Sequence, residues 1–184
     1  MPKLKAISGH TSTMGAYRYL TKGGRALASD YINMDAPVLA GSGDLPEYGD
    51  YGWGRQMDLT RAAYGNDAAW RGMRARTYKH YILSPDPKDC VSLDALRRLS
   101  IAWAQEHFGA YEVAVVYHDD NAGRIPHAHI VVNNTDLETG RRLQVPDGKA
   151  LNRSLQEMAR SMGLSYMRDD PDADRFGAAG SPRT

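Results

Sequence analysis

Two apolar segments joined by a short polar turn constrain the fold of this chain more than any other feature. They are YEVAVVYH at 111–118 and HAHIVVNN at 127–134, and eight residues, DDNAGRIP, separate them. Runs of this length and β-branched content predict strands, and the short turn favours their direct pairing. The first run is too apolar to leave one face in water, so we expect it at the centre of a sheet that is covered on both sides.

The rest of the chain alternates predicted strands with predicted helices. Strands are expected in PKLKAIS and RTYKHYILS, and helices in STMGAYRYLTKGG, more weakly around 58–74, from Ser92 to Gly109, and from about 148 to 162. The helix after Ser92 is the clearest, because it has a serine cap, an acidic first turn, an apolar stripe and a glycine beyond its end. This order predicts the α/β class: a two-layer or three-layer sandwich around a mostly antiparallel sheet.

The length of 184 residues predicts one compact domain. We assign it to 1–168, with a loop insertion near 36–56 that is crowded with Gly, Pro and acidic residues, and we interpret 169–184 as a flexible tail. No segment approaches the roughly 18 apolar residues of a membrane span. The first residues also lack the apolar stretch of a signal peptide, so we expect a cytoplasmic protein.

The net charge of +1 conceals blocks of opposite sign. Residues 1–25 contain five basic residues and no acid, whereas 101–140 contain six acids against Arg124 alone. Such blocks can fold into one basic face and one acidic pocket, so the small total does not exclude a protein that binds nucleic acid. Cys90 is the single cysteine, so a metal would need histidine and carboxylate ligands.

Three histidines stand where the two apolar strands meet their turn. If the eight-residue turn is the loop, His118 and His127 are directly opposed with Cβ atoms about 5 Å apart. His129 shares a face with His127 because strand side chains alternate, so three imidazoles converge. Asp119 and Asp120 follow at once. The set predicts a divalent metal site with open coordination, suited to Zn, Mn, Fe, Ni or Co.

Two tyrosines lie on the first predicted helix, beside the most basic block of the chain. Tyr17 aligns with Met14 and Leu20 on a stripe that is expected to face the core. Tyr19 falls off that stripe, next to the basic and glycine-containing residues 22–25. A phenol attacks phosphorus well only if a cation or a base helps to form the phenolate. A metal site nearby would therefore favour Tyr19 as a reactive residue.

Taken together, these segments resemble the HUH endonucleases, and specifically the relaxases that mobilise plasmids and conjugative elements. His127-Ala128-His129, with His118 and Asp120 upstream, resembles their third motif, YKHYILSPDP the second, and RYLTKGG the first, which holds the catalytic tyrosine. The resemblance covers about residues 1–165. Such proteins usually carry a further region, so the chain is expected to be a minimal relaxase or a truncated one.

The resemblance implies a metal-dependent transesterase that nicks single-stranded DNA at an origin of transfer through a 5′-phosphotyrosine. It makes Tyr19 the nucleophile, with Tyr17 as the alternative, and Asp120 the carboxylate that orients or accepts a proton. His118, His127 and His129 would hold the metal, commonly Mg or Mn in this family, with Zn, Ni or Co possible. Implied partners are origin DNA and accessory relaxosome and coupling proteins, without membrane insertion.

Further residues are expected to contact the DNA. Candidate phosphate contacts are Lys22, Arg25, Arg76 and Lys79, and candidate stacking platforms are Tyr78, Tyr81 and Trp53. Tyr78 and Tyr81 point to opposite faces of their strand, so at least one of them is expected in the core. For His80 a structural role and a functional role remain open. The loop over 36–56, with Tyr48 and Tyr51, would be either a cover for the DNA or a spacer.

Two rival functions remain open from the sequence. HAHIVV also resembles the histidine-triad hydrolases, which suggests a small phosphoesterase acting on nucleotides, although Val131 stands where that family needs another histidine. The other rival is a DNA-binding accessory protein that keeps the fold without the chemistry. It would bind an origin without nicking it, even with manganese present.

Overall fold

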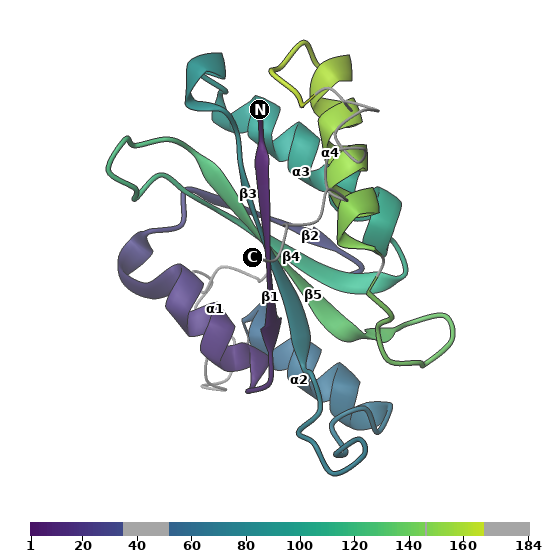
Figure 1. Ribbon diagram of the computed structural model, residues 1–184. Coiled ribbons are helices and arrows are strands. Elements are labelled where there is room, and N and C mark those ends of the chain that lie inside the picture. Colours follow the sequence, from purple (N-terminus) through teal and green to yellow (C-terminus); the bar gives the residue numbers. More distant parts are fainter. Residues whose placement is uncertain (35–51, 146, 168–184) are drawn as a thin grey trace, which may run out of the picture.

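The chain folds around a five-stranded antiparallel sheet, whose strands are labelled in Figure 1. The computed structural model describes residues 1–34, 52–145 and 147–167. The strands are β1 (Lys3–Gly9), β2 (Ala28–Ile32), β3 (Tyr78–Ser84), β4 (Tyr111–His118) and β5 (His127–Asp136), in the spatial order β1-β3-β5-β4-β2. All four pairings are antiparallel, so the predicted fold class is confirmed.

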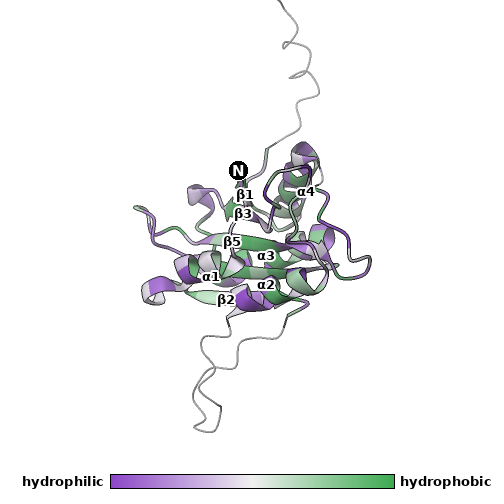
Figure 2. Ribbon diagram, turned by 90° about the horizontal axis from the view of Figure 1, so that it is seen from below, coloured by the Kyte–Doolittle hydropathy of each residue, from purple (hydrophilic) through white to green (hydrophobic). Residues whose placement is uncertain are grey.

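Helices cover both faces of the sheet, which makes the fold a three-layer sandwich. One face packs against α3 (Leu93–Phe108) and α4 (Gly148–Ser161), and the other against α1 (Thr13–Thr21) and α2 (Trp53–Ala63). Figure 2 shows the hydrophobic strands lying between these helices. Alternate residues of β4 enter each layer, since Val115 belongs to the core beneath α3 and Val116 to the core beneath α1 and α2. The predicted central position of this strand is therefore confirmed.

No helix in the described residues is both long enough and apolar enough to cross a bilayer. Residues 36–51 of the predicted insertion, with Tyr48 and Tyr51, and the whole predicted tail at 169–184 lie outside those residues.

Two predictions about the elements need correction, and one strand was missed. The helix expected around 58–74 begins at Trp53 and ends at Ala63, so the last residues of the predicted loop are helical. The chain leaves this helix at Gly65, whose φ of 69° is the left-handed conformation that ends many helices. The strand β2 was not predicted, because ASDYI is short and lacks a regular apolar alternation. It forms at the sheet edge by pairing with β4.

Two expected stacking platforms are core residues instead. Trp53 is 2% exposed and lies edge-on to Tyr17, with 5.5 Å between ring centroids. Tyr81 is 1% exposed and packs between Trp103 and Phe108 on the opposite face of the sheet. Neither ring can stack on a DNA base, so these two predictions are wrong. The prediction that at least one of Tyr78 and Tyr81 belongs to the core is confirmed.

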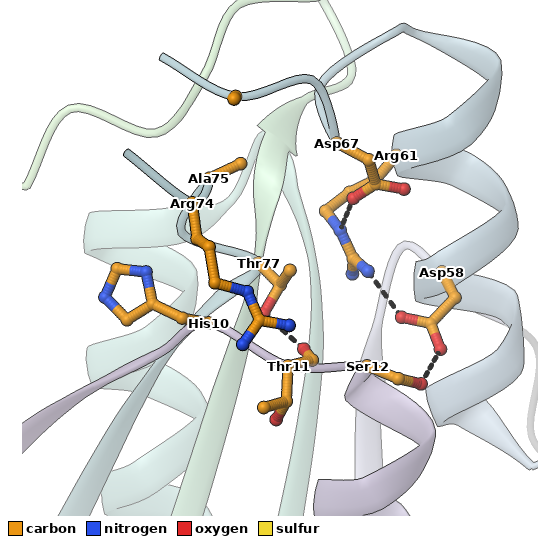
Figure 3. Close-up of a pocket in the computed structure, with 10 residues that line it drawn as sticks. His10, Thr11, Ser12, Asp58, Arg61, Asp67, Arg74, Ala75 and Thr77 are labelled. Atoms are coloured by element: carbon orange, nitrogen blue, oxygen red, sulfur yellow. Dashed lines mark hydrogen bonds and ion pairs between the residues drawn. The ribbon is translucent and has the colours of Figure 1, made fainter. Parts of the chain in front are cut away.

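The start of α1 is fixed to α2 by a charged cluster (Figure 3). Asp58 accepts hydrogen bonds from the backbone amides of Thr13 (2.8 Å) and Met14 (3.2 Å), which satisfies free donors at the helix N-terminus. Arg61 is 2% exposed, and its guanidinium lies 2.5 Å from Asp58 and 2.7 Å from Asp67. It also donates to Asn133 on β5, so the cluster joins both helices to the sheet.

Arg61→Gln should lower the free energy of unfolding by about 3 kcal/mol, because it leaves Asp58 and the polar groups around it without their buried cation. Chemical denaturation followed by circular dichroism measures this change. The matched control is Arg55→Gln on the exposed side of the same helix, which should shift stability by less than about 0.5 kcal/mol. Equal stability of the two variants would contradict the anchoring role of Arg61.

Candidate metal site and nucleophile

The three hairpin histidines converge on the α1 and α2 face of the sheet. His118 at the end of β4 pairs in register with His127 at the start of β5, and His129 follows two residues later on the same face. One nitrogen from each ring can be chosen so that all three lie within 4.8 Å of one another. The hairpin geometry expected from strand periodicity is therefore present.

Each imidazole has one nitrogen engaged by the protein. His118 Nε2 lies 2.7 Å from the Leu20 carbonyl oxygen, and His129 Nδ1 lies 3.0 Å from His80 Nε2. His127 Nδ1 lies 3.2 Å from the Ile125 carbonyl oxygen, and the side-chain nitrogen of Asn121 lies at the same distance from it. Partners of this kind orient a metal-binding imidazole and fix which nitrogen carries the proton.

The opposite nitrogens fit a metal ion. Within the residues that the structure describes, His118 Nδ1 and His129 Nε2 are buried and have no hydrogen-bond partner. His127 Nε2 lies 3.7 Å from the Asp120 carboxylate. Buried polar atoms are rarely left unpaired, so these nitrogens mark a place where a bound cation would complete the site.

The environment keeps His80, His118 and His129 neutral. Burial, together with the neighbouring histidines, lowers the pKa of His129 to about 3, and burial lowers the pKa of His80 to about 4. Burial also lowers the pKa of His118, against the opposing effect of its bond to the Leu20 carbonyl. Neutral rings keep their lone pairs, which metal ligation requires.

The sequence did not identify His80 and Asn121 as partners of these histidines. His80 reaches His129 because β3 pairs with β5, a neighbour relation that separates the two residues by 49 positions. The sequence does show a histidine, His80, on another predicted strand. It predicts a contact with His129 only once β3 and β5 are known to be neighbours.

Tyr19 lies at the exposed end of α1, close to the histidines. Its side chain is 62% exposed, and the next residue, Leu20, is buried and supplies the carbonyl that His118 contacts. The predicted orientations of the two tyrosines are confirmed, since Tyr17 packs against the core beneath α1.

Arg25 connects Tyr19 with Asp120. Its guanidinium lies 5.1 Å from the centroid of the Tyr19 ring, donates to the Tyr19 carbonyl at 3.4 Å, and forms an ion pair with Asp120. Gly23 and Gly24 have positive φ values of 66° and 67°, which turn the chain sharply after α1. This turn brings Arg25 back to the Tyr19 carbonyl. Desolvation raises the pKa of Asp120, but the bond and charge of Arg25 outweigh it and hold the pKa below its usual value.

The predicted phosphate contacts fall into two groups. Lys22 and Arg25 lie in or beside the turn that follows α1, at the histidine end of the sheet. Arg76 donates to Asn134 (3.0 Å) and to the Leu143 carbonyl, and Lys79 donates to Ser8. Asn134 is five residues beyond His129 on β5, about 17 Å at the usual rise per residue. The structure therefore does not bring Arg76 to the histidines, and Lys79 points to the opposite face from His80.

The stability of the metal-free chain should depend on His80 and His129 below neutral pH. The unfolded chain binds protons on these rings near pH 6.5, whereas the folded chain does so only near pH 4 and below. Their contribution is therefore complete above about pH 6.5 and is lost as the pH falls toward 4. Urea unfolding in chelator from about pH 7 to about pH 5 should show a steeper loss for the native sequence than for His80→Asn/His129→Asn. Parallel slopes would contradict burial of neutral rings.

Comparison with known proteins identifies one family. Residues 52–164 match the family described as "Relaxase: MobA/VirD2-like, nuclease domain". No curated protein matches the chain. Among solved structures, the MobM relaxase domain bound to 26-nucleotide pMV158 oriT DNA is 14% identical with a TM-score of 0.57, covering 100% of this chain and 97% of that one.

Two further structures carry a metal. A Mn-bound MobM relaxase domain with 23-nucleotide oriT DNA is 14% identical, with a TM-score of 0.56 over 98% of this chain and 93% of that chain. The conjugative relaxase TrwC, metal-bound with oriT DNA, is 16% identical, with a TM-score of 0.54 over 91% and 73%. At these identities the likeness shows a shared fold.

Proposed function

Because the chain belongs to the relaxase family of MobA/VirD2-like nuclease domains, we propose that it nicks single-stranded DNA at an origin of transfer and reseals it. The observation that carries the proposal is the bond between His118 and the Leu20 carbonyl, which holds the residue directly after Tyr19 against one of three convergent imidazoles. The MobM and TrwC structures with oriT DNA support the choice of substrate.

In the proposed reaction Tyr19 Oη attacks the scissile phosphorus in line. The new Oη–P bond forms as the P–O3′ bond breaks, leaving a 5′-phosphotyrosine and a 3′-hydroxyl. The phenol proton passes to Asp120 or to water, and the departing O3′ takes up a proton. Attack by a 3′-hydroxyl on the phosphotyrosine reverses these changes and reseals the strand.

Arg25 and Lys22 supply positive charge at the nucleophile. Arg25 lies against the Tyr19 ring and contacts its backbone, so its guanidinium is positioned to meet a phosphate that approaches the phenol. Asp120, paired with Arg25 and close to His127, is the acidic group between nucleophile and histidines. We assign it the role of orienting group or proton acceptor.

We assign the metal ligands to His118, His127 and His129. When bound, a divalent cation such as Mn or Mg would supply positive charge that polarises a non-bridging oxygen of the scissile phosphate. The Mn-bound MobM structure supports this assignment. The carbonyls of Leu20 and Ile125 and the side chain of His80 then act through the ligands by holding each ring in one orientation.

We place the reaction in the cytoplasm, with accessory relaxosome and coupling proteins as partners, and we assign it to a domain spanning 1–168. We infer that the DNA is single-stranded near the nick, because Tyr19 must reach a phosphorus between a short helix and the turn end of β4 and β5. The family assignment favours this activity over the phosphoesterase and the accessory protein.

Tyr19→Phe should abolish covalent DNA adducts without weakening Mn²⁺ binding, because it removes only the attacking oxygen. A randomised pool of single-stranded DNA, incubated with Mn²⁺ and separated on a denaturing gel, detects adducts and allows the joined sequence to be read. Tyr17→Phe is the matched control and should retain adducts. Adducts that persist in Tyr19→Phe and vanish in Tyr17→Phe would reassign the nucleophile.

His80→Ala should weaken Mn²⁺ binding by about 10- to 100-fold, because it removes the group that orients His129 without removing a ligand. Isothermal titration calorimetry with MnCl₂ measures the affinity. His127→Ala should weaken binding at least as much, and His10→Ala, an exposed histidine at the other end of the sheet, should leave it unchanged. An unaltered affinity in His127→Ala would refute the ligand assignment.

A further inference from the structure

A basic cavity lies at the end of the sheet opposite the histidines. Its volume is about 650 Å³, and segments 70–76 and 141–144 enclose it beside Asn134 on β5. Five arginines line it, namely Arg71, Arg74, Arg76, Arg141 and Arg142, and no Asp or Glu is among the described residues that do so. In Figure 1 the loops that carry these segments lie away from the β4–β5 turn.

A tight turn presents Trp70 beside this cavity. Trp70 and Met73 exchange two backbone hydrogen bonds of 3.0 Å, and the residues between them, Arg71 and Gly72, have φ values of 49° and 75°. Two positive φ values in a two-residue loop are typical of a type I′ turn, where Gly or Asn is favoured. An arginine in that conformation is unfavourable locally. The turn nevertheless leaves Trp70 59% exposed and Met73 65% exposed.

The arginines around Trp70 are held by neutral groups. The guanidinium carbons of Arg71 and Arg142 lie 5.9 and 5.5 Å from the Trp70 ring, and Arg142 donates to the Ala68 carbonyl at 2.6 Å. Arg76 donates to an amide and a carbonyl oxygen. No ion pair joins any of the five to a carboxylate within the described part of the chain. Their charge is therefore available to an anion.

We propose that this arginine and tryptophan surface is a second DNA-binding site, at which Arg71 and Arg142 contact phosphates and Trp70 stacks on an unpaired base. Arginine laid on an aromatic ring keeps its N–H edge for phosphate, and an exposed indole among arginines suits single-stranded nucleic acid better than an acidic peptide. The proposal rests on the proposed function, because the strand bound here would be the one cut beside Tyr19. With Asn134 about 17 Å from His129 along β5, a strand of about two nucleotides cannot reach both places.

The test compares oligothymidylates of about 2 and about 30 nucleotides, chosen below and above the usual site sizes of about 4–16 nucleotides. Binding is measured by fluorescence anisotropy in the Tyr19→Phe background without metal, so that it does not depend on cleavage. Arg71→Gln/Arg142→Gln should weaken binding of the long strand about tenfold and lower its salt slope by about 0.7 for each phosphate that the variant no longer neutralises. Trp70→Ala should weaken it about tenfold as well.

The short strand should bind the variants and the parent equally if it occupies the Tyr19 end. Arg98→Gln/Arg153→Gln, the same loss of charge on the exposed sides of α3 and α4, is the control and should bind as the parent does. Unchanged binding of the long strand by both surface variants overturns the proposal, as does equal competition by polyglutamate. Two further outcomes separate this site from the nicking reaction. If the Arg71→Gln/Arg142→Gln variant with Tyr19 intact forms adducts and binds the long strand as the parent does, this site is rejected and the nicking reaction stands. If the surface variants bind the long strand more weakly but no variant forms an adduct, the nicking reaction is rejected and this site stands.

Discussion

The hydrogen bond between His118 and the Leu20 carbonyl is the interaction on which the site depends. It satisfies a carbonyl near the end of α1, where helices run out of intrahelical donors, and it leaves the other nitrogen of His118 facing its two neighbours. At the opposite end of the same helix, Asp58 and Arg61 fix the first turn to α2 and the sheet. These contacts hold both ends of the helix, and with them the backbone of Tyr19.

The hairpin histidines combine polar contacts with burial. Each ring is held by a neutral partner, and burial favours the uncharged forms of His118 and His129, which limits repulsion among rings that each place a nitrogen within 4.8 Å of the others. At the exposed rim, Arg25 and Asp120 pair beside Tyr19. The neutral interior suits a cation, and the charged rim suits a phosphate.

Features that depend on a single strand or helix could be predicted from the sequence. Alternation along β5 places His127 and His129 together, and helical periodicity separates Tyr17 from Tyr19, so both follow from local geometry. The partnership of His80 with His129 depends on strand order, and the short strand β2 exists only through its pairing with β4. Trp53 was misjudged because the glycines before it suggested a loop, whereas Gly52 directly precedes the helix. Arg76 was predicted to contact DNA near the nick because of its charge, but the structure places it beside Asn134, at the end of β5 away from the histidines.

The two halves of the site come from distant parts of the chain. Leu20 and His118 are 98 positions apart, and between them the chain must complete β2, α2, β3 and α3. Contacts of such long range form only when the intervening loops close. A chain emerging from the ribosome therefore contains Tyr19 long before it contains the three histidines of the hairpin. The proposed capacity to cut DNA would thus be absent until the chain has been synthesised at least as far as His129 and the sheet has assembled.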